Sequence, residues 1–212
     1  MTAPRVVDVP AERFGGWLTR FADRHGELSW EWSSDRAVAR AADGAVADCL
    51  VPFPPLPPAT GVAELVAHVE RDRMVGVLLV RKGGYAAGVF RGSERVLSKV
   101  GNRLVQGRAA AGGSSQQRFA RRRENQARRA YAAASDVAAA ILLPEARRLE
   151  ALVLGGDRRA VEATLADPRL VPLRRLPLGR FLTVPDPRLR VLVVTPEQFR
   201  AVAITLTGPT ED

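Results

Sequence analysis

The sequence predicts a layered α/β (α+β) protein in which helices are interleaved with the strands of a mixed sheet. Three observations indicate this class: short strand-like stretches separated by glycine turns, a long stretch with helical spacing of small apolar residues, and a proline-rich run that divides the chain. At 212 residues the chain is long enough to bury a core. We expect a small N-terminal helix-hairpin unit at residues 1–51, a connector at 52–61 and the main domain at 62–212.

The N-terminal unit begins with an expected amphipathic helix at residues 10–24, where aromatic and aliphatic side chains recur at helical spacing. Polar and apolar residues then alternate at 27–32 and again at 37–41. Asp43 and Gly44 form a favourable hairpin turn, which predicts a return strand at 46–51.

The connector reads PFPPLPPATG, from Pro52 to Gly61. Proline fixes its own backbone torsion and disfavours helix, so the segment is expected to be stiff and extended. It is interpreted as a domain boundary. The alternative is a polyproline ligand for another protein module.

The main domain opens with an expected helix at residues 62–71. Three strands follow at 74–81, 85–91 and 95–100, joined by glycine-containing turns. Because these turns are short, the strands should pair as an antiparallel meander. A glycine-rich loop without periodicity occupies residues 101–115.

The second half of the chain is expected to alternate between helices and strands. Residues 116–143 carry a stripe of small apolar side chains at helical spacing, and Pro144 ends that helix. Asp157 is a suitable cap for a helix that runs to residue 165. Strands are predicted at 152–154, 171–176, 181–184, 190–195 and 203–207, with a short helix starting at Pro196.

The net charge of +9 and the pI of about 11.1 favour an anionic partner. Only Lys82 and Lys99 are lysines, so arginine supplies nearly all of the positive charge. The planar guanidinium group has several donors and suits phosphate contacts. Genome composition is an alternative explanation for the preference for arginine over lysine, but not for the excess of positive charge.

Several kinds of chemistry lack support in the sequence. His25 and His68 are far apart and have no cysteine or acidic cluster at ligand spacing, so no metal site and no cofactor are expected. Cys49 is the only cysteine and cannot form an intramolecular disulfide. No signal peptide and no apolar run long enough to span a bilayer are visible, so a cytoplasmic location is expected.

The stretch from residue 109 to 129 reads AAAGGSSQQRFARRRENQARR and brings three features together. Glycines let the backbone approach a ligand closely, a glutamine amide can orient water without titrating, and a basic helix can contact phosphates. This combination favours hydrolysis of an ester on RNA. The alternatives are a flexible linker and a solvated helix face. The candidate RNA-binding residues are Arg108, Arg118, Arg121, Arg122, Arg128 and Arg129.

Two separated motifs resemble the middle domain of the archaeal and eukaryotic class-1 translation release factor. One is RVLSKVGNRLVQGRAAAGGSSQQRFARRRENQARRAYAAASDVAA, and the other is LEALVLGGDRRAVEATLADPRLVPLRRL. The resemblance spans residues 75–176. It implies a ribonuclease H-like α/β domain with a mixed sheet and a long basic helix, and a loop that reaches the peptidyl-transferase centre.

The glutamine position departs from this pattern. A gapless match places Ser114 at the catalytic position of the release factor, and the glutamines follow as Gln116 and Gln117. The Gly-x-x-Gln spacing from Gly113 to Gln116 resembles the Vms-like release-factor branch, which cleaves peptidyl-tRNA on stalled ribosomes. The spacing favours Gln116, with Gln117 left open and Gly112 as part of the loop.

This second resemblance implies a metal-free peptidyl-tRNA hydrolase of ribosome-associated quality control. Its implied partners are the large ribosomal subunit, peptidyl-tRNA and ribosomal RNA, with no membrane, and the protein is expected to be a monomer. A non-catalytic rescue factor that binds the ribosome or RNA on the same scaffold is the alternative.

Overall fold

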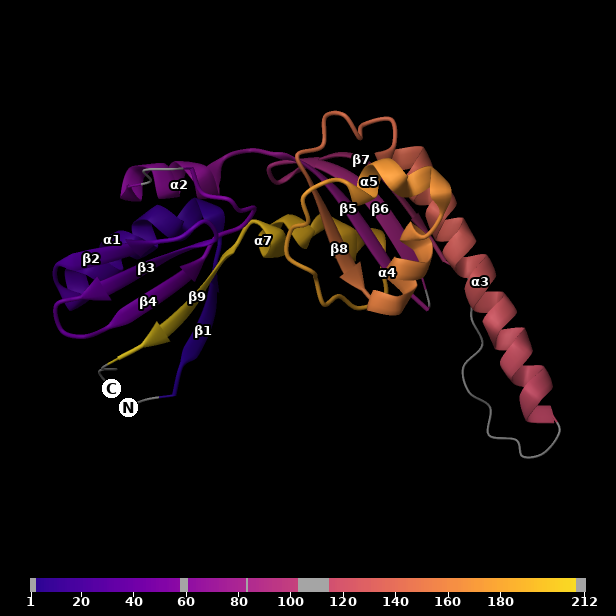
Figure 1. Ribbon diagram of the computed structural model, residues 1–212, viewed down its shortest axis with the longest axis horizontal. Helices are drawn as coiled ribbons and strands as arrows, with labels where there is room; N and C mark the ends of the chain where they lie inside the picture. Colours follow the sequence, from indigo (N-terminus) through magenta and orange to yellow (C-terminus); the bar gives the residue numbers. More distant parts are fainter. Residues whose placement is uncertain (1–2, 58–60, 83, 103–114, 209–212) are drawn as a thin grey trace. The chain divides into compact units, whose positions relative to one another are not determined.

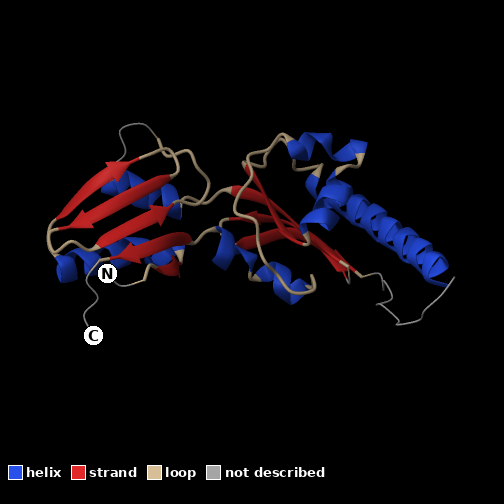
Figure 2. Cartoon of the chain, turned by 60° about the horizontal axis from the view of Figure 1, so that its bottom comes forward, coloured by secondary structure: helices blue, strands red, loops and turns tan. Residues whose placement is uncertain are grey.

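The protein folds into two compact units, each built around its own sheet (Figures 1 and 2). The first unit joins Met1–Asp72 to Pro196–Asp212, and the second is Arg73–Thr195. Both combine helices with strands, which confirms the mixed α/β class. The structure is a computed structural model, and it describes residues 3–57, 61–82, 84–102 and 115–208.

The first unit contains a five-stranded antiparallel sheet in the order β1-β9-β4-β3-β2. Strands β2, β3 and β4 form a meander, as their alternating polar and apolar residues predict. Strand β9, from the end of the chain, lies between β1 and β4. The strands are β1 (Arg5–Val9), β2 (Leu28–Trp32), β3 (Arg36–Ala41), β4 (Val46–Leu50) and β9 (Val202–Thr207).

Helices α1 (Ala11–His25) and α2 (Val62–Glu70) pack on one face of this sheet. The small side chains of β3 and β4 alternate, so that every second residue faces the helices and is buried. Larger side chains from the two helices fill the space above them, among them Phe14, Phe21 and Leu65. Small strand residues therefore allow the helices to approach the sheet closely.

Cys49 is completely buried in this core. Burial, with a smaller effect of the neighbouring Asp48 charge, raises the pKa of its thiol to about 12. Because the thiolate is the reactive form, we expect dithiobis(nitrobenzoate) to leave the folded protein unmodified at about pH 8 and to modify the thiol fully in denaturant. Fast modification of the folded protein would contradict this placement.

The second unit contains a four-stranded sheet in the order β7-β6-β5-β8. Strands β5, β6 and β7 form the predicted antiparallel meander, and β8 pairs with β5 in parallel. Parallel pairing requires a long crossover, which helix α3 supplies. The strands are β5 (Met74–Arg81), β6 (Gly84–Arg91), β7 (Glu94–Gly101) and β8 (Ala151–Gly156).

Helices cover both faces of the second sheet. The apolar cluster on one face joins β5, β6 and β8 to the C-terminal half of α3, to α4 and to the turns that follow it. On the other face, Leu192 of α6 lies against Gly88 of β6. The helical elements of this unit are α3 (Ser115–Leu142), α4 (Arg158–Leu165), the 3-10 turn η1 (Pro168–Leu170), α5 (Val171–Arg174) and α6 (Leu189–Val193). Helix α7 (Thr195–Phe199) starts at the last residue of this unit and continues in the first unit.

Three sequence-based expectations about the C-terminal part of the chain were wrong or incomplete. The predicted strand at 171–176 is the helical turn α5, because Pro172 near its start suits the first turn of a helix. The predicted strand at 190–195 overlaps α6, in which Val191 and Leu192 are buried while Val193 is exposed. Its β-branched residues suggest a strand, but packing on a sheet face overrides that preference. The segment at 181–184 contributes only a bridge, from Leu182 to Gly155.

The division of the chain also differs from the predicted boundaries at residues 51 and 62. Helix α2 belongs to the first unit, because Leu65 and Val69 are buried in its core. Strand β9 belongs there too, since it pairs with β1 and β4. Strand β1 itself was not anticipated.

Candidate nucleic-acid interface

The predicted site residues lie on helix α3 and on the segment before it. Arg108, Gly112 and Gly113 lie outside the described residues. The backbone of α3 is described from Ser115, and Gln116, Gln117, Arg118 and Arg122 belong to this helix, but their side chains are outside the description. Arg121, Arg128 and Arg129 are described fully, and all three are exposed.

Helix α3 has two halves with different surroundings (Figure 1). In the C-terminal half, Ala134, Ala138 and Leu142 are completely buried against the sheet and α4. Small side chains there let the helix approach the sheet, so this half is firmly packed. In the N-terminal half, the described arginine side chains are exposed, and the helix extends beyond the sheet.

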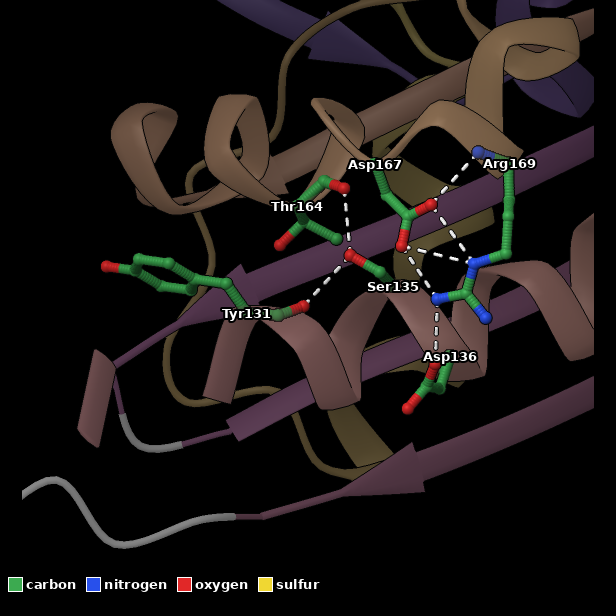
Figure 3. Close-up of polar contacts among 6 residues, drawn as sticks. All are labelled: Tyr131, Ser135, Asp136, Thr164, Asp167 and Arg169. Carbon is green, nitrogen blue, oxygen red and sulfur yellow. Dashed lines mark hydrogen bonds and ion pairs between the residues drawn. The ribbon is translucent and has the colours of Figure 1, made fainter. Parts of the chain in front are cut away.

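A buried hydroxyl in the C-terminal half of α3 ties this helix to α4 (Figure 3). Ser135 Oγ lies 3.0 Å from the carbonyl oxygen of Tyr131 in the preceding turn and 2.9 Å from that of Thr164 on α4. Thr164 Oγ1 in turn donates to the carbonyl oxygen of Ala160 at 2.8 Å. These contacts satisfy polar atoms that would be costly to bury alone.

An arginine from η1 clamps the same turn of α3, at the residue after Ser135 (Figure 3). Arg169 Nη2 lies 2.7 Å from Asp136 Oδ1 and 2.6 Å from Asp167 Oδ2. The Arg169 guanidinium, together with the Arg169 backbone N–H, lowers the pKa of the Asp167 carboxyl below its ordinary value. The same two carboxylates raise the pKa of Arg169. The clamp joins α3 to η1, the turn that follows α4.

The lowered pKa of Asp167 makes a prediction about acid stability. A carboxyl whose folded-state pKa is depressed stabilises the fold above its unfolded pKa, and that contribution is lost as the pH falls through the folded value. We therefore expect Asp167→Asn to melt at a lower temperature than the wild type at neutral pH, and the gap to close below about pH 4. The measurement is the melting temperature by circular dichroism across this range. A gap that does not change with pH would contradict a charge-based role for Asp167.

The two units carry opposite net charges. The second has 24 Lys and Arg against 9 Asp and Glu, a net charge of +15, and the first has 8 against 14, a net charge of −6. The excess of positive charge therefore belongs to the unit that contains α3. A field of this sign attracts polyanions, and arginine donors suit their phosphates.

On the exposed half of α3, one face carries an arginine stripe. Arg121 and Arg128 are seven residues apart and so lie on the same face of the helix as Ser135. Glu124 lies 3.6 Å from Arg128, but both side chains are more than 70% exposed, so the pair holds the arginine only weakly. Arg128 therefore stays accessible to a phosphate.

The described part of the chain contains neither a candidate metal site nor a candidate membrane-spanning helix. No three His, Cys, Asp or Glu side chains come together there in a group that could hold a metal ion. Nor does any described helix have the length and hydrophobicity needed to cross a membrane.

Sequence reasoning located α3 and its arginines but missed the residues that orient it. The sequence predicts that the helix capped by Asp157 ends at residue 165, but it did not single out Ser135, Asp136 or Arg169. The available signal was the Asp-Pro-Arg order, in which the aspartate caps η1 and the arginine is free to reach across to α3. Its target could not be inferred, because it lies 33 residues away along the chain.

Comparison with known proteins gives one extensive family match. Residues 73–205 match the family described as Actinobacteria/chloroflexi VLRF1 release factor. No curated protein matches the sequence.

Two solved structures resemble the chain at low sequence identity. The crystal structure of an archaeal translation termination factor, aRF1, is 15% identical with a TM-score of 0.40, covering 93% of this chain and 65% of that one. A structure described as an archaeal protein is 14% identical with a TM-score of 0.40, covering 94% of this chain and 68% of that one. The chain thus spans about 65% of the length of the termination factor.

Proposed function

Because the chain belongs to the VLRF1 release-factor family of Actinobacteria and Chloroflexi, we propose that it hydrolyses the ester bond of peptidyl-tRNA on the large ribosomal subunit. The matched residues, 73–205, include the Gly-x-x-Gln segment and all four strands of the second sheet. Membership places the chain among translation release factors. The match confirms the release-factor resemblance, and the assignment to the Vms-like branch remains a prediction.

One arrangement carries the proposal. Gln116 is the second residue of α3, three positions after Gly113, on the half of the helix whose described arginine side chains are exposed. The opposite half is fixed by its buried alanines, by Ser135 and by Arg169. A helix held at one end and exposed at the other is suited to present a short segment to a large RNA partner.

Hydrolysis of this ester depends on how the attacking water is positioned more than on a strong base in the protein. Water attacks the ester carbonyl carbon, the bond to the ribose 3′-oxygen breaks, and the products are a peptide carboxylate and a tRNA with a free 3′-hydroxyl. We propose that the Gln116 amide orients the water and that backbone N–H groups near Gly112 and Gly113 stabilise the developing oxyanion. The terminal 2′-hydroxyl would relay the proton to the leaving oxygen. Exposed arginines of α3 would hold the surrounding phosphates.

A release assay tests this function. Large subunits stalled with a labelled peptidyl-tRNA are incubated with the purified protein, and peptide and tRNA are separated on a gel. We expect free peptide together with full-length tRNA. Release no faster than in buffer alone would contradict a hydrolase, and a shortened tRNA would indicate a nuclease instead.

A second candidate function is non-catalytic binding to the ribosome or to RNA. It is favoured by Ser114, which occupies the release factor's catalytic glutamine position in a gapless match. This alternative predicts that the protein sediments with large subunits and releases no peptide. The Gly-x-x-Gln spacing places Gln116 two positions after Ser114 and favours the hydrolase over the non-catalytic function.

A further inference from the structure

The second sheet carries further exposed cations at the edge where β5 and β8 end. These strands are parallel, with Val80 opposite Gly156, so their carboxyl ends meet. Lys82 follows β5 directly, and Arg158 and Arg159 begin α4 directly after β8. All three side chains are exposed. Residues that are separate in the sequence therefore share one edge.

The backbone around these cations is well fixed. Asp157 N–H donates to the carbonyl oxygen of Val80 at 2.8 Å, which ties the start of α4 to β5. The Asp157 carboxylate accepts from the N–H of Ala160 at 3.2 Å and caps the helix. The Arg158 guanidinium lies 4.2 Å from the centre of the Phe181 ring, a cation–π distance that leaves its donors outward.

This edge adjoins the exposed half of α3. Burial, and then the charge of Asp157, raise the pKa of Tyr131, so these two side chains are near one another. Ser135, about one turn further along α3, contacts Thr164, about two turns further along α4 (Figure 3). The two helices thus run in the same direction, and α3 continues past the start of α4 (Figure 1). Arg128, three residues before Tyr131, lies about one turn beyond this contact.

Acidic groups offset little of this charge. Asp186 pairs with Arg81 at 3.9 Å, and Glu162 lies one turn further along α4. Within the described chain, no ion pair joins Lys82 or Arg159 to another residue. These cations are therefore available to an external anion.

We propose that Lys82, Arg158 and Arg159 form a second phosphate-binding surface, which continues the stripe of Arg121 and Arg128 on α3 around the edge of the sheet. We call the first three residues the basic edge. Its ligand is the phosphodiester backbone of RNA, which presents charges along a line, as the stripe and the edge together do. The inference rests on the proposed function in that both require an RNA partner, but it does not require catalysis.

The test variant is Lys82→Glu with Arg159→Glu, which spares Arg158 and its packing on Phe181. The matched control is Arg174→Glu with Arg175→Glu, two exposed residues of the same unit that carry the same change in charge. Both arginines come shortly before Leu178, which bridges to Leu152 near the amino end of β8. The control therefore lies at the opposite edge of the sheet from the basic edge.

Binding is measured with two probes across a range of salt concentrations: fluorescent deacylated tRNA, and isolated large ribosomal subunits. We expect the basic-edge variant to lose about tenfold in affinity for at least one probe, and its salt dependence to decrease by roughly 1.4 to 1.8 in logarithmic slope, as for two lost phosphate contacts. The control should remain within about twofold of the wild type, since it removes no contact. The affected probe identifies whether transfer RNA or ribosomal RNA supplies the phosphates.

Two results would overturn the proposal: wild-type affinity of the basic-edge variant for both probes, or an equal loss in the control, which would indicate a general field effect. Melting temperatures confirm that both variants fold, and Lys82→Ala with Arg159→Ala repeats the test if charge reversal destabilises the protein. The binding assay does not depend on peptide release. If the protein proves not to be a hydrolase, the measured affinities still test the basic edge.

Discussion

Replacing Gln116 with alanine is expected to slow peptide release from stalled large subunits by about 100-fold or more, because removal of one preorganised donor at a developing oxyanion has an effect of this size. Affinity for the subunit should stay within about twofold, since the contacts to phosphate are made by arginines. The measurement is the single-turnover rate of release at saturating protein, which separates chemistry from binding.

Gln117→Ala is the matched control, since it removes the same amide one residue later. We expect it to retain most of the activity. Reversed effects of the two variants would assign catalysis to Gln117, and normal release by both single variants would contradict an amide-based mechanism. A loss of subunit binding in Gln116→Ala would instead indicate a structural role.

Arg121→Glu combined with Arg128→Glu is expected to weaken association with large subunits by 10- to 100-fold, on the order expected when two phosphate contacts are replaced by repulsion. The two residues share one face of α3, on the half that extends beyond the sheet. The salt dependence of binding should become shallower as well. Co-sedimentation at several salt concentrations measures both quantities.

Helix α1 offers a matched control for this variant. Arg13 and Arg20 are also exposed and seven residues apart on a helix, but they belong to the acidic first unit. Arg13→Glu with Arg20→Glu changes the net charge equally and should leave binding nearly unchanged. If both pairs weaken binding equally, then net charge and not the position of the stripe controls association.

Much of the fold could be predicted because local signals and tertiary packing agree. The meander of β5, β6 and β7 follows from glycine turns between apolar runs, and α3 follows from its stripe of small residues. Strand β1 and the placement of β9 could not be predicted, because these two paired strands are separated by nearly the whole length of the sequence. No local pattern reports such a pairing.

The residues of the candidate site could be predicted from the sequence, but the contacts that orient them could not. The arginines of α3 are visible in the sequence as a dense run with Glu124 as the only acid between Arg118 and Arg129. The clamp by Arg169 and the hydrogen bond that ties the start of α4 to β5 depend on how the crossover returns β8 to β5. These contacts are tertiary, so they became clear only in the folded chain.

The central claim is that water cleaves the bond between peptide and tRNA, and the products formed in water enriched in oxygen-18 test it most directly. After incubation of wild-type protein with stalled large subunits, mass spectrometry measures the released peptide and the 3′ end of the tRNA. We predict one heavy oxygen in the new peptide carboxylate and an intact tRNA terminus. A peptide that still carries nucleotides, or one without the heavy oxygen, would contradict ester hydrolysis by this protein.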